Sequence, residues 1–271
     1  MKYYTLYNGH DYIVKRKKCE NIFTFDIETT SVVKLDDKIY PAIEYDKFTD
    51  DEKERAMSLS CMYIWQFGID DKVYFGRTWN ELKDFLITIE SENPYKKIIY
   101  IHNLSFEFQF LRNIFKFKNV FARKKRHVIR CELEDYNVEL RCSLTLSNIR
   151  LAKLSSTYHL SVQKLEGDLD YSVIRNSKTR LTARELKYCE NDCLVLYEYI
   201  KFEKENNKKI PMTFTGHVRE KLKDSLDNSY KNKLRKQINI EPIIYNRMVE
   251  CFAGRIYARK LVLYRESNKK C

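Results

Sequence analysis

A short apolar segment that runs directly into two acids constrains this chain more than any other feature. Residues 22–27 read Ile-Phe-Thr-Phe-Asp-Ile, and Glu28 follows. An apolar run of this length predicts a buried β-strand, along which alternate side chains share a face. Asp26 and Glu28 are therefore expected side by side. Such a pair can hold a cation, and its hard oxygen ligands suit Mg²⁺ or Mn²⁺. Alternatively, it is an ordinary exposed strand end.

The rest of the chain alternates between strand and helix periodicity. The runs that predict strands are 58–67, 73–75, 97–102 and a hairpin formed by 127–133 and 136–142. The runs that predict helices are 79–90, 105–115, 146–158 and 182–204. Thr182 and Glu185 form a capping box at the start of the last helix. This order predicts an α/β fold in which helices flank a mixed sheet.

The C-terminal part differs in composition from the part before it. After about residue 210 the chain becomes helical in pattern and strongly basic, so we expect one domain over residues 1–207 and a basic helical appendage over 208–271. The whole chain of 271 residues carries a net charge of +12. This excess suits an anionic partner, usually nucleic acid, although a Lys-rich composition from an AT-rich genome would produce it as well.

The cysteines and the hydropathy bear on the cellular compartment. The eight cysteines include no Cys-x-x-Cys pair, so a zinc site is not expected. The sequence has no secretory segment, and the cysteines therefore predict reduced thiols in a cytoplasmic protein. No apolar run reaches the ~18 residues that a membrane span requires.

Two further groups of polar residues stand where chemistry is commonly placed. His102 to Glu107 occupy the junction between a predicted buried strand and a helix, and α/β folds build their sites at the carboxyl ends of such strands. Tyr188 and Asp192 are four residues apart on a predicted helix, hence on one face. Alone, each group could be an ordinary surface feature.

Taken in order, these groups resemble the three exonuclease motifs of the DEDDy class of proofreading nucleases in family B DNA polymerases. The protein-primed branch, found in small phages and linear plasmids, is most similar. The matching segments are Phe25-Asp26-Ile27-Glu28-Thr29-Thr30, Tyr100-Ile101-His102-Asn103-Leu104-Ser105-Phe106 and Tyr188-Cys189-Glu190-Asn191-Asp192. Ser143-Leu144 resembles the pair that contacts single-stranded DNA in that branch. The resemblance implies an RNase H-like sheet and covers about residues 22–257.

The sequence departs from the pattern of this branch at several places. The second motif ordinarily ends in Asp, whereas this chain has Glu107, whose extra methylene moves the carboxylate by roughly 1.5 Å. Alignment on Gly167-Asp168-Leu169-Asp170-Tyr171 puts Glu166 at the position of the family's lysine, and Lys164 is the nearest lysine. Phe252-Ala253-Gly254 resembles the linker to the polymerase domain, with Arg255 replacing its second glycine. The polymerase motifs are absent, so we expect an exonuclease domain followed by the start of a truncated polymerase domain.

The resemblance implies hydrolysis of single-stranded DNA from its 3′ end with two divalent cations, Mg²⁺ or Mn²⁺. The residues it assigns to the metals are Asp26, Glu28, Glu107 and Asp192. Tyr188 would orient the attacking water. The residues it assigns to DNA are His102, Asn103, Phe106, Ser143, Leu144 and Lys164. Phe106 could equally be a core residue, and Lys164 a solvated surface lysine.

Two other interpretations of the sequence remain open. The chain could be an inactive remnant that still binds single-stranded DNA, or a structural protein whose acids are unrelated. A terminal protein would be a further partner of the complete polymerase, and a phage or plasmid gene would place the protein in the host cytoplasm. The basic run Arg123-Lys124-Lys125-Arg126-His127 could contact the DNA backbone or be a solvated approach to a hairpin.

Overall fold

The computed structural model describes residues 4–7, 10–13, 19–165, 170, 172–207 and 209–225. The chain divides into two compact units, residues 1–217 and 218–271. The predicted polymerase linker and most of the 208–271 segment lie outside the described residues, as do Glu166 and most of the Gly167–Tyr171 motif. The predicted boundary at residue 207 stays a prediction. Among the described residues, no helix is long and apolar enough to cross a membrane.

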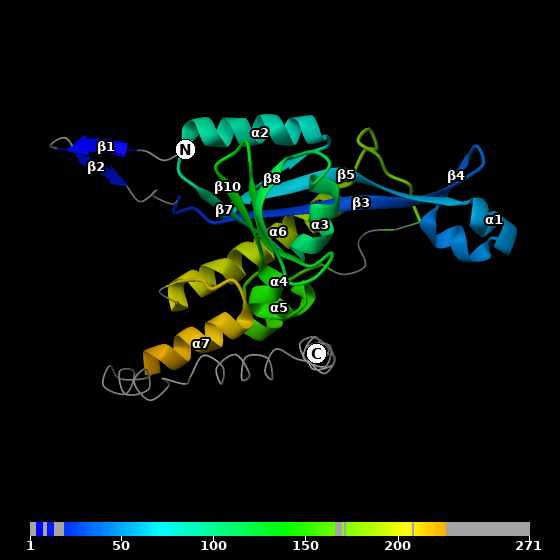
Figure 1. Ribbon diagram of the computed structural model, residues 1–271. Helices are drawn as coiled ribbons and strands as arrows, with labels where there is room; N and C mark the ends of the chain where they lie inside the picture. Colours follow the sequence, from blue (N-terminus) through cyan, green and yellow to red (C-terminus); the bar gives the residue numbers. More distant parts are fainter. Residues whose placement is uncertain are drawn as a thin grey trace, which may run out of the picture. The chain divides into compact units, whose positions relative to one another are not determined.

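An eight-stranded mixed sheet forms the centre of the first unit (Figure 1). Its strands, in spatial order, are β6 (Lys72–Gly76), β5 (Met57–Ile69), β3 (Phe23–Leu35), β7 (Lys97–Ile101), β10 (Val138–Cys142), β9 (Val128–Leu133) and β8 (Phe117–Ala122), with β4 (Lys38–Pro41) paired beside β3. The pairings of β7 with β3 and with β10 are parallel, and the others are antiparallel. A separate hairpin joins β1 (Tyr4–Tyr7) and β2 (His10–Ile13).

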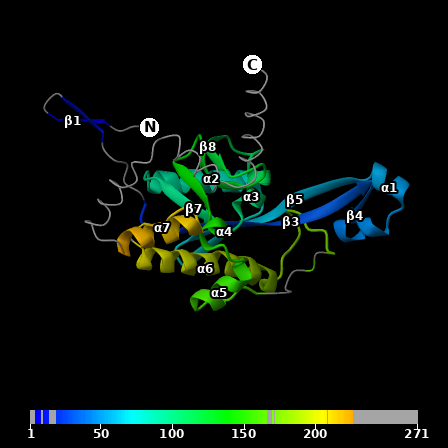
Figure 2. The same cartoon turned by 60° about the horizontal axis from the view of Figure 1, so that its bottom comes forward.

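Helices pack against the sheet on both of its faces. One core joins β3 to α2 (Trp79–Glu92) and α3 (Leu104–Leu111), through Phe23, Phe25 and Ile27. A second core contains α5 (Leu151–Tyr158) and α6 (Ala183–Asn206), which lie side by side in Figure 2. Because side chains alternate along a strand, the residues between the core phenylalanines point toward α6. Thr24 accordingly donates from Oγ1 to the carbonyl of Cys193 on that helix.

The mixed sheet flanked by helices confirms the predicted architecture. The capping box predicted at Thr182 and Glu185 is present, and its helix ends at Asn206. Such features depend on residues close together in the sequence, so local patterns predict them well.

Several predicted boundaries were wrong. The predicted helix over 146–158 is two helices, α4 (Ser143–Ser147) and α5, because Asn148 adopts a left-handed conformation with φ of 57°. The first strand does not end at the acids: β3 continues to Leu35 beyond an irregularity in the pairing at Glu28 and Thr29. Strand β8 was not predicted.

The extension of β3 and β5 leads to elements that sequence patterns did not indicate. Both strands have 13 residues, and β4, a 3-10 helix at Ala42–Lys47 and α1 (Asp50–Arg55) lie between them. The outer halves of β3 and β5 form a two-stranded extension, the ribbon. Figure 1 shows the ribbon projecting from the sheet, with α1 and β4 at its end. The last described helix is α7 (Phe214–Ser225).

Candidate metal centre

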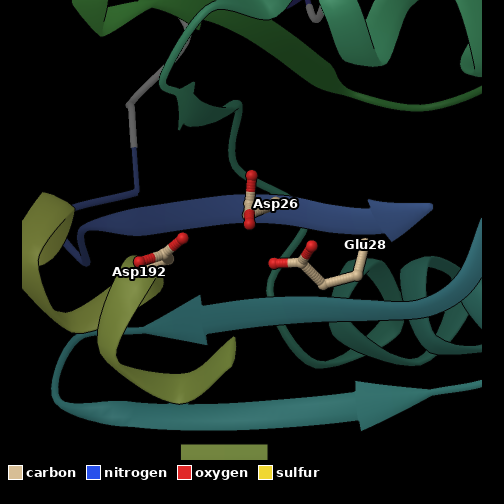
Figure 3. Close-up of side chains that lie close together, drawn as sticks. All are labelled: Asp26, Glu28 and Asp192. Atoms are coloured by element: carbon tan, nitrogen blue, oxygen red, sulfur yellow. The ribbon is translucent and has the colours of Figure 1, made fainter. Parts of the chain in front are cut away.

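Three carboxylates from two elements converge on the α6 side of β3. One oxygen each from Asp26, Glu28 and Asp192 lies within 4.8 Å of the other two (Figure 3). Side chains alternate along β3, and Phe25 and Ile27 are buried in the core on its other face. Asp26 and Glu28 therefore point toward α6. Asp192 comes from the buried face of α6 and is 5% exposed. Three acids from distant parts of the sequence thus share a space that one divalent cation could occupy.

The acids of this group ionise with difficulty because they are buried together. Burial and, to a smaller extent, the neighbouring Asp192 carboxylate raise the pKa of Asp26 to about 7, against the opposing effects of Lys164 and of hydrogen bonds. Burial, Asp26 and Asp192 also hold the pKa of Glu28 well above its usual range. Burial and mutual repulsion both disfavour the ionised forms, and a bound cation would relieve both effects.

Glu107, from a third element, contacts Asp26 as well. It belongs to the first turn of α3, is 2% exposed, and hydrogen-bonds with the Asp26 carboxyl group. Burial and Asp26 raise the pKa of Glu107 well above its usual value. Glu107 is not part of the group formed by Asp26, Glu28 and Asp192. Of these three acids, the structure therefore brings Glu107 to Asp26 alone.

Two buried carboxylate oxygens have no hydrogen-bond partner among the described residues. They are Oε2 of Glu107 and Oδ1 of Asp192. Buried polar atoms normally find a partner, and leaving one unsatisfied costs about 1–3 kcal/mol. Carboxyl oxygens left in this state fit the demands of Mg²⁺ or Mn²⁺, which prefer hard oxygen ligands.

Lys164 supplies the one cation that the described residues place beside Asp192. Its Nζ donates to Asp192 Oδ2 at 2.6 Å and lies 5.1 Å from the centre of the Tyr188 ring. Tyr188 is 8% exposed and precedes Asp192 by one turn of α6. The interpretation of Lys164 as a solvated surface lysine is therefore wrong, since its side chain is only 21% exposed and ion-paired.

Gln66 belongs to the same site and was not predicted. It stands opposite Asp26 in the pairing of β5 with β3, is fully buried, and donates from Nε2 to Asp26 Oδ2 at 2.7 Å. This contact fixes the orientation of the Asp26 carboxylate. The signal in the sequence was a single amide inside the apolar run Tyr-Ile-Trp-Gln-Phe, since a buried polar side chain requires a partner.

Four of the six residues predicted to contact DNA directly follow the ends of two parallel strands. Cys142 of β10 pairs with Ile101 of β7, so His102 and Ser143 follow their strands at the same level. Their side chains meet, with 3.0 Å between His102 Nδ1 and Ser143 Oγ. Burial and the charge of Lys164 lower the pKa of His102 to about 4, which keeps its imidazole neutral near pH 7.

The remaining three residues of this set differ in exposure. Asn103 is exposed in a left-handed conformation, with φ of 70°, immediately before α3. Phe106 is 43% exposed, so its interpretation as a core residue is wrong. Leu144 is partly buried and packs against the core formed with α2.

Comparison with known proteins identifies a similar fold but no family. No protein-family profile matches the chain, and no curated protein shows significant sequence similarity. Its structure is similar to phi29 DNA polymerase complexed with primer-template DNA and incoming nucleotide substrates, with a TM-score of 0.51 and 16% identity over 73% of this chain. Phi29 DNA polymerase complexed with primer-template DNA alone gives a TM-score of 0.50 and 16% identity over 71% of this chain. The chain spans 32% of the length of these polymerases, so the likeness establishes a shared fold for that portion.

Proposed function

We propose that this chain is a 3′→5′ exonuclease domain that removes nucleotides from the 3′ end of single-stranded DNA. The observation that carries the proposal is the convergence of Asp26, Glu28 and Asp192 within 4.8 Å of one another. The ordered sequence motifs and the fold similarity support the same assignment. On these grounds we also assign the chain to a protein-primed family B DNA polymerase, in which proofreading would serve replication of a phage or plasmid genome in the host cytoplasm.

The proposed reaction is hydrolysis of a phosphodiester bond assisted by divalent cations. Asp26, Glu28 and Asp192 would hold one cation, and Glu107, which contacts Asp26, would help to hold a second. Bound Mg²⁺ or Mn²⁺ would supply Lewis-acid stabilisation of the attacking and leaving oxygens. Gln66 keeps the Asp26 carboxylate in place through its 2.7 Å hydrogen bond.

Other side chains would position water and substrate. The Tyr188 hydroxyl would orient the attacking water, and Lys164 would neutralise a phosphate beside Asp192. The exposed ring of Phe106 offers a surface on which a terminal base can stack. Neutral His102, held by Ser143, would hydrogen-bond the strand together with Asn103, and Leu144 would contribute an apolar contact.

A degradation assay tests this assignment directly. The purified chain would be incubated with Mn²⁺ and a single-stranded oligonucleotide labelled at its 5′ end. We expect a ladder of products shortened stepwise from the 3′ end. Asp26→Ala should abolish the ladder, whereas Glu54→Ala, on exposed α1, should leave it unchanged.

The displaced position of Glu107 favours one second candidate, an inactive domain that binds single-stranded DNA. Glu107 lies outside the group of three acids, so the second cation would have fewer ligands. The same assay separates the two functions. Binding of the oligonucleotide without shortening, in either Mn²⁺ or Mg²⁺, would exclude the exonuclease and leave the binding domain.

A further inference from the structure

A basic turn at the edge of the sheet carries charges that no described residue neutralises. Residues 123–127, the basic turn, join β8 to β9, and Arg123, Lys124, Lys125 and Arg126 are all exposed. Within the described ranges none of these four cations forms an ion pair. Like charges this close repel one another, so the turn attracts a polyanion.

The cations just beyond the turn show the opposite arrangement. Arg130 on β9 pairs with Glu132 and Glu139, and Arg141 on β10 pairs with Glu139 at 2.6 Å. The arginines of β9 and β10 are therefore neutralised within the sheet, whereas the four cations of the turn have no ion-pair partner among the described residues. A merely structural role would not require this concentration of charge.

The basic turn is fixed to the helix that carries two residues of the candidate site. At the start of β8, the Phe117 ring lies 4.9 Å from the ring of Phe108 on α3. At the start of β9, the Val128 carbonyl accepts a hydrogen bond from Ser105 Oγ, also on α3, at 3.4 Å. Both anchors flank the first turn of α3, which bears Phe106 and Glu107. Figures 1 and 2 show β8 beside α3.

Exposed aromatic rings accompany these charges. Phe121 on β8 is 52% exposed two residues before the basic turn, and Phe106 on α3 is 43% exposed. Alternating cations and aromatic rings bind single-stranded nucleic acid, because the cations contact phosphates and the rings stack on unpaired bases. A duplex has no free base faces for such stacking.

We propose that the basic turn and Phe121 bind the single-stranded DNA on the 5′ side of the nucleotide that enters the metal centre. The sequence left open whether the basic turn contacts DNA or is solvated, and it did not indicate Phe121. The proposal rests on the exonuclease function for the direction of the strand. It implies that the turn governs affinity for long substrates and leaves the cleavage step itself unchanged.

Equilibrium binding in EDTA tests the proposal without requiring catalysis. Fluorescence anisotropy would be measured with labelled oligothymidines of about 4 and about 16 nucleotides, the range of site sizes of single-strand-binding domains. The variant Arg123→Ala/Lys124→Ala/Lys125→Ala/Arg126→Ala should bind the longer strand at least about tenfold more weakly at low salt, and the slope of log Kd against log salt should fall by about 0.7 for each lost phosphate contact. Binding of the shorter strand should change little.

Two other variants separate local contacts from total charge. Lys34→Ala/Lys38→Ala/Lys47→Ala/Lys72→Ala removes the same number of exposed cations from the ribbon and the start of β6, and should keep nearly normal affinity. Phe121→Ala should weaken binding of the longer strand about fivefold or more without changing the salt slope. Circular dichroism would show that each variant keeps the fold.

The outcomes that would overturn the proposal are distinct from failure of the exonuclease assignment. Unchanged affinity of the turn variant, an equal loss in the ribbon variant, or preference for a duplex of the same length would each refute it, as would wild-type chain that fails to bind the longer strand. Weaker binding by the turn variant would support it even if no oligonucleotide were ever shortened. Persistent degradation of the shorter strand by that variant would show that the metal centre is intact.

Discussion

The acids of the candidate metal centre and the ion-paired cluster around Glu139 have opposite electrostatics. In the metal centre, Asp26, Glu28 and Asp192 face one another with Lys164 as their nearest cation, and burial with repulsion raises the pKa of Asp26 to about 7. On β10, burial of Glu139 also opposes ionisation, but Lys96 and Arg141 outweigh it and lower the pKa of Glu139 to about 2.

The contrast shows how to separate a structural acid from one that requires an external cation. The protein supplies Glu139 with three cations, since Lys96, Arg130 and Arg141 all lie within 2.9 Å. Among the described residues, the acids around Asp26 form one ion pair, with Lys164, and keep two unsatisfied carboxylate oxygens, while Arg175 acts on Glu28 only from a distance. Burial alone therefore does not mark a candidate metal site, whereas an acidic cluster with too little positive charge does.

We expect the largest effect, a loss of exonuclease activity, when one acid of the candidate metal centre is neutralised. We expect Asp26→Asn to reduce exonuclease activity by about 10³-fold, because the cation loses its central ligand. The same change should raise the melting temperature in EDTA, since it removes repulsion from a buried group. Gel assays and thermal unfolding measure the two effects. Lower stability in EDTA would mean that this cluster is as well compensated as the one on β10.

Neutralising the structural acid should have the opposite result. Glu139→Gln leaves Lys96, Arg130 and Arg141 without their shared partner in a buried place, and loss of one member of such a network costs about 3 kcal/mol. Urea unfolding would report the change in free energy. Exonuclease activity at a temperature where the variant is folded should be unaffected. A variant that loses activity while keeping its stability would contradict the division between the clusters.

Removing the hydrogen bond that orients Asp26 should give a smaller effect. Gln66→Met fills a similar volume but no longer donates to Asp26 Oδ2, so affinity for Mn²⁺ should fall about tenfold, as for other residues that orient metal ligands. Isothermal titration calorimetry measures that affinity. Gln163→Met, outside the apolar strand, provides a control that should bind Mn²⁺ normally. Equal affinity in all three proteins would exclude a role for Gln66.

The sequence predicted these clusters unequally because the metal centre combines local and distant contacts. The face shared by Asp26 and Glu28 follows from strand alternation, and that shared by Tyr188 and Asp192 from helix periodicity. The contact of Gln66 with Asp26 depends on the register between β3 and β5, which periodicity within one strand does not determine. Similarly, no local pattern indicated that Lys164 would reach Asp192, 28 residues later. Recognition of family motifs supplied part of what periodicity could not.

The smallest expected effect is a difference in how stability depends on pH without divalent cations. The folded pKa of Asp26, about 7, exceeds its unfolded value of about 3.9, so its contribution is fully favourable below pH ~3.9 and is lost as pH rises through 7. Wild-type stability in EDTA should therefore fall on the order of 1 kcal/mol between pH ~6.5 and pH ~8, and less in Asp26→Asn.

This pH window isolates the metal centre from the other groups with shifted pKa. The depressed pKa of Glu139, about 2, affects stability only below its unfolded pKa of about 4.3, where protonation removes a favourable charge. The pKa of His102, about 4, affects it only below about 6.5. Thermal unfolding of wild type, Asp26→Asn and Glu139→Gln across the window checks the assignment. Glu139→Gln should show the same change of stability with pH as the wild type. If Asp26→Asn shows that change too, the acids around Asp26 are already compensated, and the electrostatic argument for a bound cation fails.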